Sequence, residues 1–386
     1  MTCNICNVAD FCSLEHLFFH ITRNENACAG VKNALNNLAQ NTLYLEAFAE
    51  VNPSNDLKPP SFILNPLLRL ECPDIDCRCY CTSVTQEYML SRLDLIAAYR
   101  ALNTHPSILK ACNSAIGTHY LDRCDNVNIR SITTNLMIRI GFLQLAYDFL
   151  KWWLIHGEYD CRARPPIPFL DIRNTNPFER CNQLDNEILY GPGTLISLKC
   201  ELPPASLLLS LALIKFKVLA DVKELRNAQI LRKKLPFDIV YCVKEQVKCT
   251  DIVRTHREIY KMDSIEEYDA VIAGLEEDME AIFYRFVGLV KVGYRVWEAL
   301  AARRVKTSKP RNTRTKRKIS SMYGANVDAW HETPGALEWV AEALYGGSET
   351  EIGDVGMETL SEAGMESASE FSEFEDEGGV SLQGYM

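Results

Sequence analysis

Apolar side chains recur at the spacing of an α-helix along most of this chain, and this pattern restricts the fold more than any other feature. Between residues 129 and 154 the apolar positions follow one another three or four residues apart, which places them on one broad helical face. They are Leu136, Ile140, Leu143, Tyr147 and Leu150. No segment shows a convincing alternation of apolar and polar residues with the turns of a β-hairpin. The pattern predicts an all-α fold.

The predicted helices cover residues 31–51, 87–102, 107–122, 129–154 and 205–231, with a further helical region over 237–304. The first half of the helix at 205–231 is apolar nearly all round, so we expect it to be buried. Asp125 and Asn126 supply N-cap chemistry before residue 129. Successive antiparallel helices of this length favour a helical-repeat-like array similar to tetratricopeptide repeats, although no fixed period is visible.

Composition divides the chain into five parts. They are a Cys/His-rich head (1–30), a helical body (31–302), a basic linker (303–320), a C-terminal helix segment (321–345) and an acidic tail (346–386). Thr333 and Pro334 predict the N-cap and first residue of the C-terminal helix. The tail is rich in Glu, Ser and Gly, which predicts disorder.

Charge, hydropathy and cysteine content indicate which partners and which cellular compartment to expect. The tail holds eleven acids and no Lys or Arg, so the net charge of -10 leaves residues 1–345 nearly neutral, with no reason to expect nucleic-acid binding. No run of eighteen apolar residues predicts a membrane span, and the first thirty residues do not resemble a signal peptide. Fifteen cysteines, an odd number, favour reduced thiols in an intracellular compartment, the cytoplasm or the nucleus.

Four segments together resemble a fungal family of MYND-type zinc-finger proteins with a helical body. In chain order they are DNVNIRSITTNLMIRIGFLQLAYDFLKWW (125–153), PFLDIRNTNPFE (168–179), LSLALIKFKVLADVKELRNA (209–228) and AWHETPGALEWV (329–340). The resemblance covers most of residues 1–345. It implies a helical-repeat-like body and a role in binding other proteins, and it implies no known reaction.

The head matches only part of the family's finger, so it is described as a zinc-finger remnant. A complete MYND finger binds two zinc ions through seven cysteines and one histidine in an interleaved order. Cys3, Cys6, Cys12 and Cys28 occupy cysteine positions, and His16 stands at the ligand position after Cys12. Asn24 occupies the position of the family's histidine.

The family's interleaving implies that Cys3, Cys6 and Cys28 share one metal, with His20 as the nearest replacement for Asn24. Cys12 and His16 would share a second metal with two cysteines upstream of Met1. Three interpretations remain open, since structural zinc needs four N or S donors. Either one zinc ion binds, or the sequence is truncated and both sites exist in a longer chain, or the finger binds nothing.

Other candidate residues each have an ordinary structural interpretation. Four further cysteines form a second cluster that either binds a metal or packs a loop: Cys72, Cys77, Cys79 and Cys81. Tyr147, Trp152 and Trp153 line a ligand groove or, more commonly for such aromatics, pack a core. His105, His119 and His156 have no motif partner. Glu332, next to His331, is interpreted as a charge that complements a helix N-terminus.

No Gly-rich phosphate loop, nucleophile elbow or H-E-x-x-H motif occurs, so we expect no enzymatic activity. The expected function is that of a scaffold or adaptor that binds peptide segments of protein partners, with a structural zinc site. One alternative is a nuclear transcriptional co-regulator that uses the basic linker and a tail in which Phe371 and Phe374 lie among acids. A second alternative is a relative of SET-type lysine methyltransferases, although the SET motifs are not found.

Overall fold

The computed structural model describes only part of the chain. The described residues are 2–8, 13–51, 83–122, 125, 129–156, 168–180, 203–232, 234–247, 249–289, 293–302 and 323–345. Across these ranges α-helices dominate and no β-strand is present, which confirms the all-α fold class. The second cysteine cluster, the basic linker and the acidic tail lie outside the described residues.

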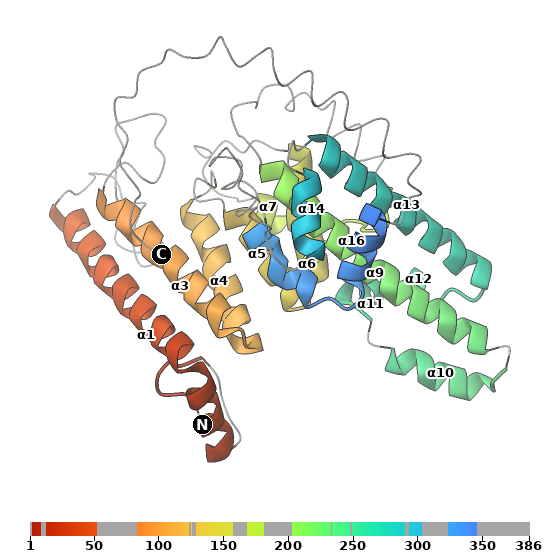
Figure 1. The fold of residues 1–386 in the computed structure, drawn as a ribbon, viewed down its shortest axis with the longest axis horizontal. Coiled ribbons are helices and arrows are strands. Elements are labelled where there is room, and N and C mark those ends of the chain that lie inside the picture. The colour runs from red at the N-terminus through yellow and green to blue at the C-terminus, as the bar shows by residue number, and fades with distance from the viewer. Residues whose placement is uncertain are drawn as a thin grey trace, which may run out of the picture.

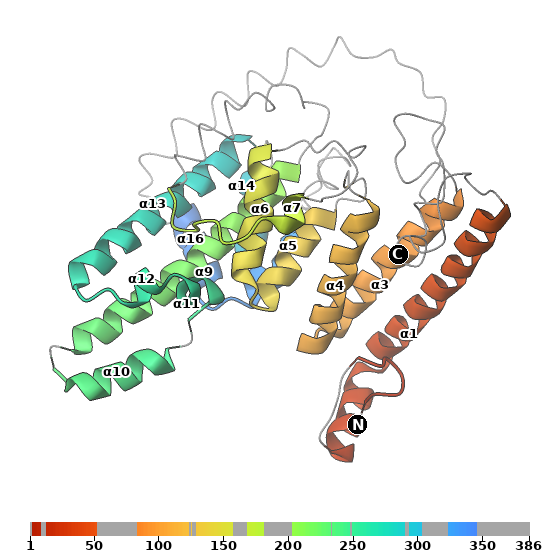
Figure 2. The same ribbon diagram turned by 180° about the vertical axis from the view of Figure 1, so that it is seen from behind.

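The first four helices follow one another in a row, and several of the later ones contact helix α9, Pro203–Leu231 (Figure 1). Their bounds are α1 Leu14–Val51, α3 Ser83–Leu102, α4 His105–Leu121, α5 Ile129–Arg139, α6 Leu143–His156, α7 Pro168–Asp171, α9 Pro203–Leu231, α10 Phe237–Gln246, α11 Asp251–Thr255, α12 Arg257–Tyr260, α13 Ile265–Leu289, α14 Gly293–Ala301 and α16 Ala336–Tyr345, and residues 323–331 are also helical. Helix α1 packs along α3, α3 along α4, α4 on α5, and α13 along α9 (Figures 1 and 2). Each helix therefore buries its apolar face against its neighbours, as in helical-repeat arrays.

The connection between α3 and α4 shows how the chain reverses direction. Only Asn103 and Thr104 separate the two helices, and Asn103 has a positive φ of 49°. Thr104 and Ser107 form a capping box, in which each side chain accepts a hydrogen bond from the other residue's backbone N–H. This box satisfies donors that the first turn of α4 would otherwise leave unpaired. So short a link makes α3 and α4 antiparallel neighbours.

The single helix predicted over 129–154 is wrong, because the chain breaks into α5 and α6. Gly141 adopts a φ of 83°, and the N–H of Phe142 donates to the carbonyl of Met137, which ends α5 in a Schellman motif. The carboxylate of Asp251 then accepts from the backbone N–H groups of Leu143 and Gln144 at 3.1 and 3.2 Å. A residue more than a hundred positions away thus caps α6.

The start of α5 follows the sequence prediction. The Asp125 carboxylate accepts hydrogen bonds from the backbone N–H groups of Ile129 and Arg130, at 2.6 and 3.1 Å. Asp125 thus supplies the N-terminal capping that its position predicts. Asn126 lies outside the described residues.

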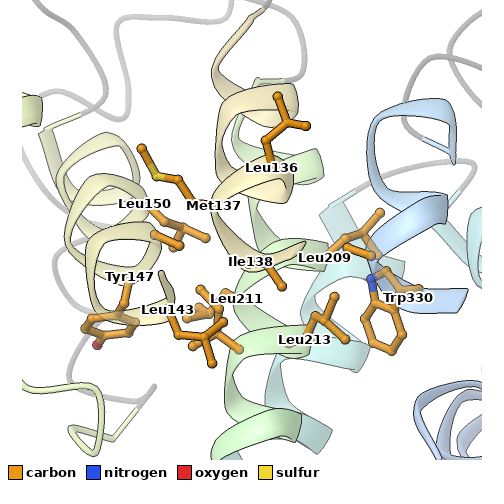
Figure 3. Close-up of a cluster of buried hydrophobic side chains, with 14 of the residues drawn as sticks. Leu136, Met137, Ile138, Leu143, Tyr147, Leu150, Leu209, Leu211, Leu213 and Trp330 are labelled. Atoms are coloured by element: carbon orange, nitrogen blue, oxygen red, sulfur yellow. The ribbon is translucent and has the colours of Figure 1, made fainter. Parts of the chain in front are cut away.

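Helix α9 lies at the centre of the core, as its apolar composition predicts. Leu209 and Leu213 are fully buried and Leu211 nearly so. Figure 3 places these leucines between side chains of α5, α6 and the helix at 323–331, including Ile138 and Trp330. Each fully buried leucine contributes about 1.5 to 3 kcal/mol relative to exposure. A helix that is apolar all round is therefore accommodated only because other helices surround it.

A buried ion pair lies within this largely apolar region. Lys215 of α9 is inaccessible to solvent, and its ammonium lies 3.0 Å from the carboxylate of Asp278 on α13. The same ammonium donates to the backbone carbonyl of Glu179 at 2.8 Å. Two buried charges remove much of each other's desolvation penalty only when they are paired and hydrogen-bonded in this way. The contact joins α9, α13 and the segment that follows α7.

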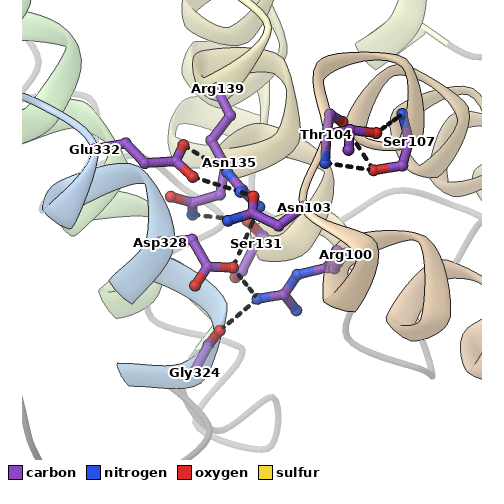
Figure 4. Close-up of polar contacts among 10 residues, drawn as sticks. All are labelled: Arg100, Asn103, Thr104, Ser107, Ser131, Asn135, Arg139, Gly324, Asp328 and Glu332. Carbon is purple, nitrogen blue, oxygen red and sulfur yellow. Dashed lines mark hydrogen bonds and ion pairs between the residues drawn. The ribbon is translucent and has the colours of Figure 1, made fainter. Parts of the chain in front are cut away.

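Residues 323–345 return to the same core and attach to helices far away in sequence. Arg139 of α5 lies 3.2 Å from Asp328 and donates to Glu332 at 2.8 Å, while Arg100 of α3 lies 3.0 Å from Asp328 (Figure 4). Trp330 is fully buried, with its ring centroid 5.3 Å from that of Trp297. The ring contact and the ion pairs hold the C-terminal helices against the body.

Two details of this region differ from the sequence prediction. Helix α16 begins at Ala336, and the Thr333 hydroxyl donates to the carbonyl of Ala329 at 2.8 Å, so it closes the preceding helix instead of capping the next one. The role expected for Glu332 at a helix N-terminus is also wrong, since Glu332 pairs with Arg139. Tertiary partners outweigh the local capping preference at both positions.

Candidate metal centre

The first ligands lie on a tight turn at residues 3–7. The N–H of Asn7 donates to the carbonyl of Cys3 at 2.9 Å, and Asn7 has a positive φ of 51°. This turn brings the thiols of Cys3 and Cys6 to the same side. The ammonium of Lys110 on α4 donates to the carbonyl of Asn7 at 2.6 Å and ties the turn to the helical body.

Helix α1 supplies the other two ligands. It begins at Leu14, well before the predicted start at residue 31, and continues across the boundary expected between head and body. His20 and Cys28 stand eight residues apart, a rise of about 12 Å in a straight α-helix. Between them Asn24 departs from helical geometry, with φ -118° and ψ 22°. The resulting kink, together with the length of the His20 side chain, lets the two ligand atoms approach.

Asn24 also supports His20 directly. Its side-chain amide donates to the backbone carbonyl of His20 at 3.1 Å and lies 3.3 Å from Nδ1 of the His20 ring. Residues that contact the second ring nitrogen of a ligating histidine fix the orientation of the ring. Asn24 therefore positions a candidate ligand, whereas the MYND pattern expected the ligand itself at this position. Its place four residues after His20 on a helix is the sequence signal for this role.

Four ligand atoms converge at one point. The ligand atoms of Cys3, Cys6, His20 and Cys28 all lie within 4.8 Å of one another and form a group that could hold a metal ion. Nε2 of His20 lies 3.7 Å from Sγ of Cys6 and 3.2 Å from Sγ of Cys28. In a tetrahedral zinc site, bonds of about 2.3 Å to sulfur and 2.0 to 2.1 Å to nitrogen place these atoms about 3.6 Å apart. The donor set therefore fits a structural zinc ion.

Burial and electrostatics favour a cation at this point. Cys3 and Cys28 are inaccessible to solvent, Cys6 is 1% exposed and His20 is 5% exposed. Burial, reinforced by the neighbouring thiols of Cys6 and Cys3, raises the pKa of Cys28 to about 12. Thiolates this close repel one another, and a divalent cation among them removes that penalty. Burial lowers the pKa of His20, which favours the neutral ring that a metal ligand requires.

The pKa of Cys3 shifts in the opposite direction. Burial by itself raises it, but hydrogen bonds from the backbone of Cys6 and Ile5, together with the thiols of Cys6 and Cys28, outweigh burial and lower it. Hydrogen bonds to a thiolate favour the charged form. Backbone N–H groups of this kind orient and stabilise ligating thiolates.

The candidate metal centre is part of the helical array. Cys3, Cys6 and Cys28 belong to the same hydrophobic cluster as Tyr99 and Leu102 of α3. Burial, with a smaller contribution from Cys6, raises the pKa of Tyr99. The turn and the start of α1 therefore share one buried cluster with α3.

Of the two remaining predicted ligands, Cys12 and His16, the structure describes only His16. His16 is exposed, one turn before His20 on α1, and is not a member of the group. Cys12 lies outside the described residues. A second metal site is accordingly not assembled within the part of the chain that the structure describes.

The other candidate residues that the structure describes are either packed in the core or exposed at the surface. Tyr147 is fully buried and Trp152 and Trp153 nearly so, so these aromatics belong to the core. His119 is buried, with Nε2 3.1 Å from the Thr133 hydroxyl, and His105 is exposed. The side chain of His156 lies outside the described residues.

A hollow of about 620 Å³ lies beside the metal centre. One wall is formed by the first turns of α1, including His16, Phe19 and Arg23, and the other by residues 101–104 at the end of α3 and its link to α4. The edge of His20 also faces it. The hollow thus lies where the metal centre joins α1 to the α3–α4 pair.

Fold and site together define an all-α array. Near its N-terminus it carries a buried group of candidate ligands made of three cysteines and one histidine. Comparison with known proteins finds no matching family model, no similar curated protein and no similar solved structure. Among the described helices, none has both the length and the apolar character needed to cross a membrane.

Proposed function

We propose that this chain is a non-enzymatic interaction protein in which Cys3, Cys6, His20 and Cys28 hold one structural zinc ion. The observation that carries the proposal is the convergence of four buried soft donors within 4.8 Å. Structural zinc sites are closed and tetrahedral, with cysteine and histidine ligands. Thiolates with one imidazole favour zinc over Mg²⁺ or Ca²⁺, which prefer oxygen.

In this proposal the zinc ion cross-links separate parts of the chain. It links the turn at residues 3–7 to two points on α1, and the turn is tied to α4 through Lys110. A structural zinc ion supplies folding free energy where few apolar contacts are available. The metal therefore holds the start of α1 against α3 and α4.

The proposed binding surface is the hollow between α1 and residues 101–104, and its ligand is a short peptide segment of a partner protein. Arg23 and Asn103 line it, and none of its described lining residues is acidic. The resemblance to the MYND-type family supports the same role. Thiolate ligands suit the reducing conditions of the cytoplasm or nucleus.

Metal analysis of the purified full-length protein tests this function. We expect one zinc ion per chain, lost in His20→Gln and retained in His16→Gln, which changes a histidine one turn away on the same helix. A chain without zinc, or equal loss in both variants, contradicts the proposed site. Two zinc ions per chain would instead favour a second site that includes Cys12 and His16.

Partner binding needs its own measurement. A partner captured by the zinc-loaded chain should be lost with Arg23→Glu, which reverses the charge in the hollow. The control is Arg232→Glu, at an exposed site beyond the end of α9. Equal capture by both variants excludes the hollow as the binding surface.

A further inference from the structure

The first turns of α1 carry an exposed apolar ridge, formed by Leu14, Phe18 and Phe19. These side chains are 70%, 72% and 63% exposed. They line a shallow, almost wholly apolar hollow together with Glu15 and Thr22. In both ribbon views this part of α1 projects beyond the neighbouring ends of α3 and α4 (Figures 1 and 2).

The metal centre explains why the ridge points outward. His20, on the same turns of α1, is directed into the ligand group, and Cys28 anchors the next part of the helix. The helix cannot rotate to bury Phe18 without removing His20 from its position. Contiguous exposed apolar patches of this kind usually mark a binding site.

The size of the ridge favours a short segment over a second folded copy. With these exposed fractions the three side chains present on the order of 400 Å². A standard interface between folded proteins buries about 800 Å² on each partner. The ridge supplies about half of that area.

The charge beside the ridge favours an acidic segment. The guanidinium carbon of Arg23 lies 5.9 Å from the centroid of the Phe19 ring, and the Arg23 side chain is exposed. Arg23 forms no ion pair with any residue that the structure describes. A ligand that places apolar side chains on Phe18 and Phe19 therefore gains a charge-assisted hydrogen bond from an adjacent carboxylate.

We propose that residues 371–377 of this same chain, FSEFEDE, dock on the ridge. Phe371 and Phe374 are three residues apart, which places them on one face if the segment becomes helical on binding. The same seven residues include four acids, and no Lys or Arg occurs between 346 and 386. The segment has the apolar and acidic groups that the ridge and Arg23 require.

The chain is long enough to allow this contact. Residues 346–371, which connect the end of α16 to the segment, extend to at most about 90 Å. The 38-residue helix α1 is itself about 57 Å long. The maximal reach of the link thus exceeds the length of the longest described helix, which is compatible with docking within one molecule.

Docking would cover the ridge and the edge of the hollow beside the metal centre. An external peptide that uses the hollow would then have to displace the tail. The inference goes beyond the proposed function, since it needs the ridge and Arg23 but no particular external partner.

Hydrogen exchange of the full-length, zinc-loaded protein tests the inference. We expect amides of 371–377 to exchange about tenfold more slowly than those of 349–360 in the same tail. Phe18→Ser should abolish the difference. Leu43→Ser, which removes another exposed apolar side chain from α1, should leave it unchanged. Zinc content measured on each sample separates loss of the ridge from loss of the metal centre.

A second variant tests the tail from the other side. Phe371→Ser combined with Phe374→Ser should increase hydroxyl-radical labelling of Phe18 and Phe19 severalfold, and the control Met357→Ser with Leu360→Ser should not. Exchange of 371–377 at the same rate as the rest of the tail would overturn the inference. Protection that survives Phe18→Ser, or that rises with protein concentration as in docking between copies, would overturn it as well.

Discussion

Nε2 of His20 lies 3.2 Å from Sγ of Cys28, although the two residues stand eight positions apart on one helix. A straight helix does not allow this approach. The non-helical geometry of Asn24 and the long imidazole side chain make it possible. The ligand pair therefore depends on a local distortion of α1.

Removing the metal should loosen the N-terminal end of the array and leave its centre intact. A metal present at a hundred times its dissociation constant stabilises the folded state by about 2.7 kcal/mol, and chelation removes that term. We expect faster hydrogen exchange in residues 3–28 and unchanged exchange in α9. Cys28→Ser should show the fast exchange without chelator and no further change with it. If amides along the whole chain lost protection from hydrogen exchange equally, this would contradict a metal that stabilises only the N-terminal end.

Asn24→Leu should weaken zinc binding without removing a ligand. Leucine favours regular helix and cannot hydrogen-bond to His20, so both the kink and the ring orientation are lost. Loss of a residue that orients a metal ligand typically lowers affinity by about 10- to 100-fold. Competition with a chromophoric chelator measures the change. Asn36→Leu, at an exposed position further along α1, is the control and should bind zinc normally.

Arg139→Met should destabilise the fold by about 2 to 3 kcal/mol, because Glu332 loses its cation and Asp328 keeps only Arg100. The Arg139 side chain is only 3% exposed, whereas Asp328 is 39% exposed. In a double-mutant cycle with Asp328→Asn we expect a coupling free energy of about 1 kcal/mol, reduced by solvent screening. The exposed pair Arg232 and Asp263 should give less. Denaturant unfolding measures the coupling free energy of each pair. Equal coupling free energies for the two pairs would show that burial of Arg139 does not strengthen its interaction.

Two glycines at the junction of α13 and α14 should respond oppositely to alanine. A Cβ at Gly293 would lie 2.6 Å from the backbone oxygen of Phe286, so Gly293→Ala should destabilise the protein by more than about 1 kcal/mol. A Cβ at Gly288 meets no atom within 4 Å. Gly288→Ala should therefore stabilise the helix by about 0.5 to 1 kcal/mol. Thermal unfolding measures the melting temperatures of the two variants. If both temperatures shifted in the same direction from that of the wild type, this would contradict the packing described.

His119 should make the fold sensitive to acid. Burial, with a smaller contribution from the charge of Arg130, lowers the pKa of His119 to about 3, whereas the unfolded value is about 6.5. Below pH 6.5 the unfolded chain binds a proton that the folded chain does not, so the free energy of unfolding falls as the pH falls. Between pH 7 and pH 5 this loss is about 2 kcal/mol.

His119→Gln keeps a hydrogen-bonding side chain and removes the titration. Its free energy of unfolding should fall by about 2 kcal/mol less than that of the wild type over the same interval. Other titrating groups are common to both proteins and cancel in the difference. Parallel stability curves would show that His119 is not buried in its neutral form.

Local residue patterns determined the helical class, the burial of α9 and the types of ligand at the N-terminus. The apolar run around Leu209 has no solvent-compatible helical face, and Cys3, Cys6 and Cys28 are donors wherever they fold. The cap at Asp125 was equally local, since it needs only the first turn of α5. These features depend on neighbours within a few residues.

Only the tertiary structure decided the rest, because the deciding atoms come from remote parts of the chain. The N-terminal cap of α6 depends on Asp251, and the role of Glu332 depends on Arg139. His16 and His20 lie one turn apart on nearly the same face of α1, so His20 and not His16 joins the group because of its position along the helix, one turn closer to Cys28. Periodicity shows which side of a helix is apolar, but the partner that side meets is settled when distant segments compete to bury it.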